Sequence, residues 1–281
     1  MSTIITPGQF PLDFHTDPSG HIRPLGLVPP LPGASLPVGD FTVPIVPQDQ
    51  WVEFDLTTDP TYPLKIKDQD SRGACNGHAT AEAMELARWI HGQAHVPLSG
   101  WFPYAILCGG WDRGSSIGEA LSLIQTKGLA PESDVEYEVI NPRKLTDQAY
   151  KDALNFKCEV GAPLETWEQI MSAVQLKLGG VNLSIRCGGS FTPDAGGVVN
   201  VSRGPGNHAI TAGHGAKKVT AGPYKGQWAI KWQNHWTAQW GLNGYAWLVQ
   251  DHWDKQSYAE AWVIRTPIEN PTDPSIPPVA M

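Results

Sequence analysis

Residues 67–86, KDQDSRGACNGHATAEAMEL, constrain this chain more than any other stretch, because a short polar loop becomes a helix there at a cysteine. From Cys75 onward, apolar residues recur at spacings of three and four, the period of an α-helix. Cys75 is therefore expected in the first turn of a helix, where free backbone N–H groups and the helix dipole favour an anion. The thiolate is the reactive form of cysteine, so this position indicates a nucleophile.

A thiol nucleophile needs a base that takes its proton and a third group that orients the base. His208, in Asn207-His208-Ala209-Ile210, lies 133 residues after Cys75, and Asn234 lies 159 residues after it. Papain-type His and Asn residues lie roughly 130–150 residues after the Cys, so the second interval is slightly long. Gln69, six residues before Cys75, supplies a side-chain amide that could donate to an oxygen bound beside the sulfur.

These blocks resemble the papain-like cysteine peptidases. In that family a Gln stands six positions before the Cys, and the His is followed by an apolar strand with a glycine-rich end, as in HAITAGHG here. The family's Asn is followed by Trp two residues later and then by W-G-x-x-G-Y, which Asn234 to Tyr245 reproduce. The resemblance covers residues 45–265 and implies an α+β fold with a helical lobe, an antiparallel β-sheet or barrel lobe, and the active-site cleft between them.

The resemblance also implies roles for individual residues. Cys75 would attack the scissile carbonyl, and His208 would act first as general base and then as general acid. Asn234 would orient the imidazole, and Trp236 would shield that hydrogen bond from water. Gln69 and the backbone N–H of Cys75 would form the oxyanion hole.

In the family, a glycine-rich segment before the second helix holds the substrate backbone. Gly114 and Ser115 stand in that place and would hold the substrate backbone. Ile117 and Ala209 would line the pocket for the second residue on the acyl side, with a preference for an apolar side chain. Trp236 completes this predicted substrate-binding set.

The sequence departs from the family pattern close to the nucleophile. Arg72 replaces a disulfide-forming Cys three residues before Cys75, and Asn76 replaces the usual Trp after it. Gly77 and His78 replace a small residue and an aromatic one. These changes make the surroundings of the thiol more polar and leave the predicted fold unchanged.

Three segments are expected along the chain. Residues 1–44 hold nine of the 25 prolines and are expected to form an extended arm. Residues 45–265 form the peptidase domain, with a helical lobe at about 68–165 and a β lobe at about 166–265, where β-branched and aromatic runs alternate with glycine turns. Residues 266–281 form a second proline-rich tail. If the arm lies across the Cys75 cleft it is an inhibitor or plug, and if it extends onto a neighbour it is an anchor.

Composition excludes several classes of function. The net charge is −8 and there is no basic run, so nucleic acid is not an expected partner. No apolar run is long enough to cross a bilayer, and the N-terminus lacks the pattern of a secretory signal. The four cysteines are widely spaced without a C-x-x-C pair, so no metal or other cofactor is expected. Without a signal peptide the thiols are expected to be reduced and the location cytoplasmic, or virion-associated if the proline-rich arms tie the chain to an assembly.

Three alternatives accompany the peptidase hypothesis. Ser116 lies in a G-x-S-x-G match that would make it a hydrolase serine, but no strand is expected before it. His91 and His95 share a helical spacing that would suit zinc, but the expected Glu is absent. A papain-like scaffold could also serve as a non-catalytic structural or binding subunit of a larger assembly such as a virus particle, tied to its partner through the arm. The remaining cysteines are expected in the core: Cys108, Cys158 and Cys187.

Overall fold

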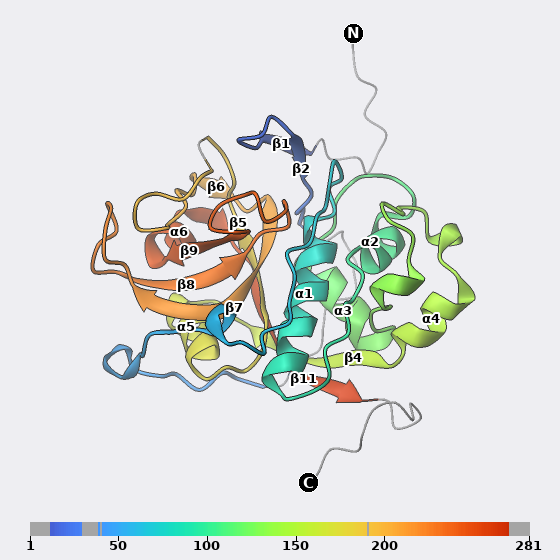
Figure 1. The fold of residues 1–281 in the computed structure, drawn as a ribbon, viewed down its shortest axis with the longest axis horizontal. Helices are drawn as coiled ribbons and strands as arrows, with labels where there is room; N and C mark the ends of the chain where they lie inside the picture. The colour runs from blue at the N-terminus through green and yellow to red at the C-terminus, as the bar shows by residue number, and fades with distance from the viewer. Residues whose placement is uncertain (1–11, 30–38, 40, 190, 270–281) are drawn as a thin grey trace.

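A computed structural model of the chain describes residues 12–29, 39, 41–189 and 191–269. Much of the predicted arm, residues 1–11 and 30–38, lies outside these described residues, and so does the predicted tail from residue 270 onward. The expected α+β fold is confirmed, with helices gathered on one side of a long central helix and an antiparallel sheet on the other (Figure 1).

The main sheet of the described residues has seven strands and is antiparallel throughout. Its spatial order is β4 (Phe156–Pro163), β11 (Ala261–Glu269), β5 (Val181–Ile185), β7 (His208–Lys218), β8 (Trp228–Gln233) and β9 (Tyr245–Val249), with β3 (Phe54–Asp55) also paired to β7. β7 lies between β5 and β8, so its first residue, His208, is placed in the middle of the sheet.

The central helix α1 (Cys75–Ile90) runs between the sheet and the other helices of the helical lobe (Figure 1). On one side of it lie α2 (Trp101–Cys108), α3 (Ile117–Thr126) and α4 (Asp147–Ala153). In the β lobe, α5 (Trp167–Gln175) packs on β5 and β7, and α6 (Gln250–Asp254) follows β9. Short 3-10 helices occupy Gln48–Gln50, Leu56–Thr58, Glu132–Asp134 and Pro142–Lys144.

Small residues let the sheet approach α1 closely. The helix is rich in alanine, and residues 75–88 are all buried. A Cβ added to Gly180, just before β5, would lie 2.3 Å from the carbonyl oxygen of Ala83, so only glycine fits there. This tight packing fixes the helix that carries the cysteine against the sheet that carries the histidine.

Two secondary-structure expectations need correction. Residues 156–163 lie in the stretch expected to be helical but form the edge strand β4, paired with β11. Phe156, Cys158 and Val160 are buried while Glu159 is exposed, which is the two-residue period of a strand. The strand pieces expected in residues 45–66 amount to β3, which has two residues.

The first described segment forms a β-hairpin, β1 (Asp13–Thr16) and β2 (Ile22–Leu25), above the junction of the two lobes (Figure 1). A second small sheet pairs β6 (Gly204–Pro205) with β10 (Gln256–Tyr258) in parallel.

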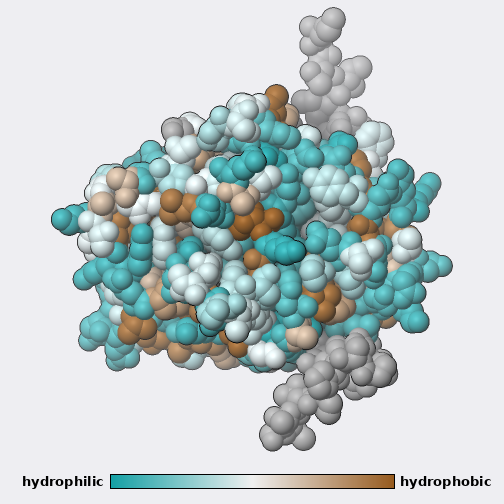
Figure 2. Space-filling model, viewed as in Figure 1, coloured by the Kyte–Doolittle hydropathy of each residue, from teal (hydrophilic) through white to brown (hydrophobic). Residues whose placement is uncertain are grey.

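The face in Figure 2 is mainly hydrophilic, with hydrophobic residues in small separate groups. Within the described ranges, no helix combines the length and the apolar character needed to span a bilayer.

Candidate active site

Cys75 is the first residue of α1 and is fully buried. The residue before the helix is Ala74, whose side chain cannot cap the first turn, so the backbone N–H groups there are left for another acceptor. Burial raises the pKa of the Cys75 thiol to about 11, while backbone hydrogen bonds with Ala209 and Gly26 act in the opposite direction. Cys75 therefore lies beside the start of strand β7, in a covered state that favours the neutral thiol.

His208 begins β7, and its Nε2 lies 2.8 Å from Oδ1 of Asn234. The same oxygen accepts the backbone N–H of His235 at 2.9 Å. Because an amide oxygen only accepts, Nε2 of His208 must carry the hydrogen, which leaves the lone pair on Nδ1. Nδ1 is buried and has no hydrogen-bond partner in the described part of the chain. Burial lowers the pKa of His208 to about 4, against the effect of the Asn234 hydrogen bond.

Trp236 connects this pair to the loop before α1. Its ring centroid lies 4.9 Å from that of His208, and its side chain is almost completely buried. Its Nε1 donates to Oε1 of Gln69 at 3.0 Å, so the N–H₂ group of Gln69 faces away from Trp236. That group donates to the carbonyl oxygens of Pro24 at 2.9 Å and of Arg72 at 2.8 Å.

The described end of the arm, residues 24–28, crosses this site. Ser115 N–H donates to the carbonyl of Gly26 at 2.9 Å, and Val28 N–H donates to the carbonyl of Ser115 at 3.2 Å. Leu27 N–H donates to the carbonyl of Asn207, the residue before His208, at 3.1 Å. The backbone N–H and carbonyl of Ser115, which were predicted to hold a substrate, are thus occupied by the arm of the same chain.

The side chains of the arm fit the same site. Leu27 is buried in the core cluster that contains Cys75, Ile117 and Ala209. Leu25 is buried in the other cluster, which contains Trp236.

Gly26, between these two leucines, has no room for a side chain. A Cβ there would lie 1.7 Å from the carbonyl oxygen of Gly73. The predicted Gly114 is likewise restricted, because its Cβ would lie 2.2 Å from the carbonyl oxygen of Gly26. The two backbones can meet only because both residues are glycines.

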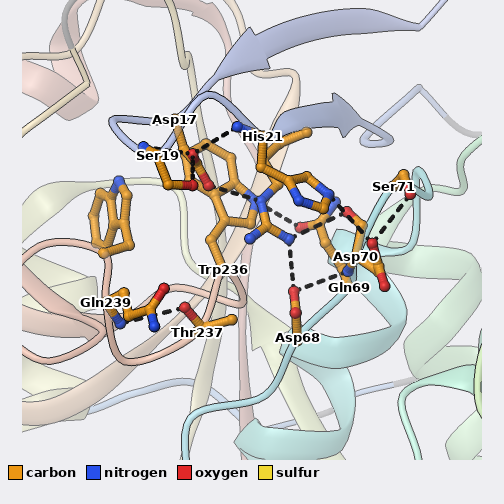
Figure 3. Close-up of polar contacts among 12 residues, drawn as sticks. Asp17, Ser19, His21, Asp68, Gln69, Asp70, Ser71, Trp236, Thr237 and Gln239 are labelled. Atoms are coloured by element: carbon orange, nitrogen blue, oxygen red, sulfur yellow. Dashed lines mark hydrogen bonds and ion pairs between the residues drawn. The ribbon is translucent and has the colours of Figure 1, made fainter.

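Charged groups hold the hairpin onto the loop before α1 (Figure 3). Arg23 is buried, with Nε 3.1 Å from Oδ2 of Asp17 and Nη1 2.7 Å from Oδ1 of Asp68. His21 Nε2 lies 3.2 Å from Oδ1 of Asp70 at the more exposed rim. Sequence reasoning missed this arrangement, since neither arginine nor aspartate in a proline-rich arm has a distinctive spacing.

Ser116 and the histidine pair at 91 and 95 have structural roles instead of the catalytic and zinc-binding ones considered for them. Ser116 caps α3 and forms a capping box with Glu119, which accounts for its position. His91 contacts the backbone carbonyls of Leu178 and Arg265, whereas His95 pairs with Glu85 at 2.9 Å. Over the described residues, no group of three or more potential ligands is arranged for a metal ion. All four cysteines are buried and free.

Comparison with known proteins agrees with this geometry. The family model described as papain family cysteine protease matches residues 52–265. No curated protein matches the chain. Among solved structures, xylellain, a cysteine protease from Xylella fastidiosa, superposes with a TM-score of 0.64 at 18% identity, covering 85% of this chain and 98% of that one.

Two further structures extend this comparison. ProCathepsin B S9 from Trypanosoma congolense gives a TM-score of 0.59 at 17% identity, covering 88% of this chain and 87% of that one. The bromelain protease from Ananas comosus, in complex with the E64 inhibitor, gives 0.54 at 20% identity, covering 80% and 100%. At these identities the likeness establishes the fold.

Proposed function

The chain belongs to the papain family of cysteine proteases, and on that premise we propose that it cleaves internal peptide bonds through Cys75, His208 and Asn234. The observation that carries the proposal is the His208–Asn234 hydrogen bond, which puts the hydrogen on Nε2 and leaves Nδ1 free to take the thiol proton. Cys75 belongs to the neighbouring helix turn and contacts the backbone of Ala209, the next residue after that histidine.

The chemistry follows from these groups. His208 Nδ1 takes the proton of Cys75, and the sulfur attacks the scissile carbonyl carbon to form a tetrahedral oxyanion. Gln69 Nε2 and the backbone N–H of Cys75 donate to this oxyanion. His208 then gives its proton to the leaving amine, and the C–N bond breaks to leave a thioester. Water, deprotonated by His208, attacks the thioester and releases the acid and the thiol.

A peptide-cleavage assay with matched variants tests this proposal. In a chain whose arm is displaced by Gly26→Ala, Cys75→Ala should abolish both cleavage of an unstructured protein and labelling by a thiol-directed epoxide. His208→Ala should retain substrate binding and lose turnover. Cys158→Ala is a suitable control, because Cys158 is a buried thiol on β4 and lies outside the proposed site. Cleavage that survives Cys75→Ala would contradict the proposed nucleophile.

The arm supports a second part of the proposal, that the chain inhibits itself. Pro24 accepts from the amide of Gln69, and Gly26 contacts both Ser115 and the Cys75 thiol, so a substrate could not bind while the arm is in place. Packing of residues 12–29 on the chain's own cleft favours a plug over an anchor to an assembly partner.

Arm removal is then required for activity. Displacement of the arm would admit water to Cys75 and remove the burial that raises the pKa of its thiol.

A further inference from the structure

The backbone of His235 forms hydrogen bonds with two of the proposed catalytic residues, Asn234 and Gln69. Its N–H donates to Oδ1 of Asn234 at 2.9 Å, the atom that also faces Nε2 of His208. Its carbonyl oxygen accepts the backbone N–H of Gln69 at 2.9 Å. A displacement of residue 235 would therefore move the amide behind the imidazole and the amide of the oxyanion site together.

The side chain of His235 is fastened to α1. Its Nε2 lies 3.0 Å from Oε2 of Glu82, and both side chains are completely buried. Glu82 comes seven residues after Cys75, which is two helical turns, so the two residues lie on the same face of α1. The contact ties the loop that carries Asn234 directly to the helix that carries the nucleophile.

A second imidazole lies on the other side of this carboxyl group. His214 of β7 has its Nε2 3.1 Å from Oε1 of Glu82, although the pair is not aligned as a hydrogen bond. Nδ1 of His214 lies 2.7 Å from the hydroxyl of Tyr62. His214 therefore fills the space beside Glu82 and limits the positions that the carboxyl group can take.

The environment favours a hydrogen bond between uncharged partners. Burial raises the pKa of Glu82 well above its usual value and lowers that of His235 well below its own. A neutral carboxyl group can donate to a neutral imidazole, and a buried bond of this kind is costly to leave unmade. Since all four cysteines are free, no disulfide shares the task of holding this loop.

We propose that Glu82 and His235 are positioning residues, whose buried contact holds Asn234 behind His208 and Gln69 beside Cys75. This inference rests on the proposed function and deepens it. Neither residue touches the reacting atoms, so their effect would pass through the orientation of the imidazole. Misplacement of catalytic groups by about 1 Å can cost on the order of a hundredfold in rate.

The test replaces Glu82 by Leu, whose apolar side chain fills a similar volume but cannot form the hydrogen bond to His235. His235→Ser is the partner variant, because it removes the ring and keeps the backbone N–H and carbonyl. Glu82→Gln is the conservative variant, since an amide can still donate to the imidazole of His235. His252→Gln is the control, a buried imidazole on α6 with no hydrogen bond from either ring nitrogen in the described residues.

The first readout is the ¹⁵N spectrum of His208 in the full chain, assigned with His208→Gln. We expect the wild type, Glu82→Gln and His252→Gln to show Nε2 protonated as one defined tautomer. Glu82→Leu and His235→Ser should lose that single tautomer. If Glu82→Leu does not fold, His235→Ser carries the same test. An unchanged His208 spectrum in a folded variant overturns the inference.

The second readout is turnover in the full chain after arm displacement by Gly26→Ala. Glu82→Leu should lower kcat about tenfold to a hundredfold with little change in KM, and adding His235→Ser should cost little more, because both remove one contact. Wild-type kcat in both variants overturns the inference and leaves the proposed function intact. Cleavage that survives Cys75→Ala would instead contradict the proposed function. In that case the ¹⁵N spectrum of His208 would still test whether Glu82 and His235 position the imidazole.

Discussion

The arm and the β lobe both lie against the first turn of α1, but they are held there by different kinds of contact. The arm is joined by main-chain hydrogen bonds around Gly26, by the buried side chains of Leu25 and Leu27, and by polar pairs, of which His21–Asp70 is at the more exposed rim. The β lobe is joined by a tightly packed interface and by fully buried polar contacts such as Glu82–His235. The arm is therefore a removable cover of the active site, whereas the β lobe is a permanent part of the domain. We expect the arm to leave the cleft without unfolding of the domain.

The largest expected effect is that of acid on the free energy of unfolding of the domain. Burial lowers the pKa of His208 to about 4 and of His78, His214 and His252 to about 3. The unfolded chain binds protons below about pH 6.5 while the folded chain does not, so stability falls as pH falls toward these values. Each imidazole contributes about 1.4 kcal/mol per pH unit, and four together contribute about 5 kcal/mol per unit. His235 and Glu82 add contributions of opposite sign, because burial lowers the pKa of one and raises the pKa of the other, so they offset each other.

The measurement is the free energy of unfolding by urea between pH 7.5 and 4.5. His252→Gln should reduce the slope by about one imidazole's share, because that residue lies away from the proposed site. A stability that does not change across this range would contradict the buried, neutral histidines.

Gly26→Ala should displace the arm, because it adds a side chain at a position that has room for none. Its Cβ would lie 1.7 Å from the carbonyl oxygen of Gly73, so the arm could not seat without displacement. An overpacking cost of about 1–3 kcal/mol corresponds to roughly a fivefold to 150-fold increase in the open fraction. Iodoacetamide labelling of the folded chain measures this increase. Ile22→Ala, an exposed change in the same hairpin, should have no effect.

Arg23→Ala should open the cleft by an amount that overlaps the range for Gly26→Ala and exceeds that for His21→Ala. The guanidinium is buried between Asp17 and Asp68, and its loss leaves Asp17 without its charged partner. Hydrogen bonds to charged groups are worth about 1.5–3 kcal/mol, which corresponds to roughly a tenfold to 150-fold faster labelling. Lys231→Ala is the control, because its pair with Asp55 joins β8 to β3 and involves no residue of the arm. Equal rates in both variants would remove Arg23 from the account of the cover.

His21→Ala should have the smallest effect. The His21–Asp70 contact is partly exposed on both sides, and such pairs contribute about 0–1 kcal/mol. The labelling rate should change by less than about fivefold. If His21→Ala raised the labelling rate more than Arg23→Ala does, the exposed contact would hold the arm more strongly than the buried one, which would contradict this account.

The sequence contains enough to predict the fold and the family, because the loop before Cys75, the block at His208 and the block at Asn234 stand in a specific order. Papain-family membership and the α+β architecture are confirmed. The edge strand β4 was missed although Phe156, Cys158 and Val160 alternate, because the helical periods on either side of it are stronger.

The contacts of the arm and of Glu82 could not be predicted in the same way. Glu82 looks like an ordinary helical glutamate, and only the fold places His214 and His235 against it. Gly26 looks like an ordinary glycine in a proline-rich segment until Gly73 and Gly114 meet it in space. Local periodicity gives no information about such long-range approaches.

The most direct test of the central claim is the pH dependence of Cys75 alkylation in the Gly26→Ala chain, with and without His208→Ala, the labelled cysteine being identified by mass spectrometry. We predict rapid labelling of Cys75 near pH 6 when His208 is present and loss of that labelling when it is replaced. Labelling that follows an ordinary thiol titration in both chains would contradict the pairing of this sulfur with this imidazole.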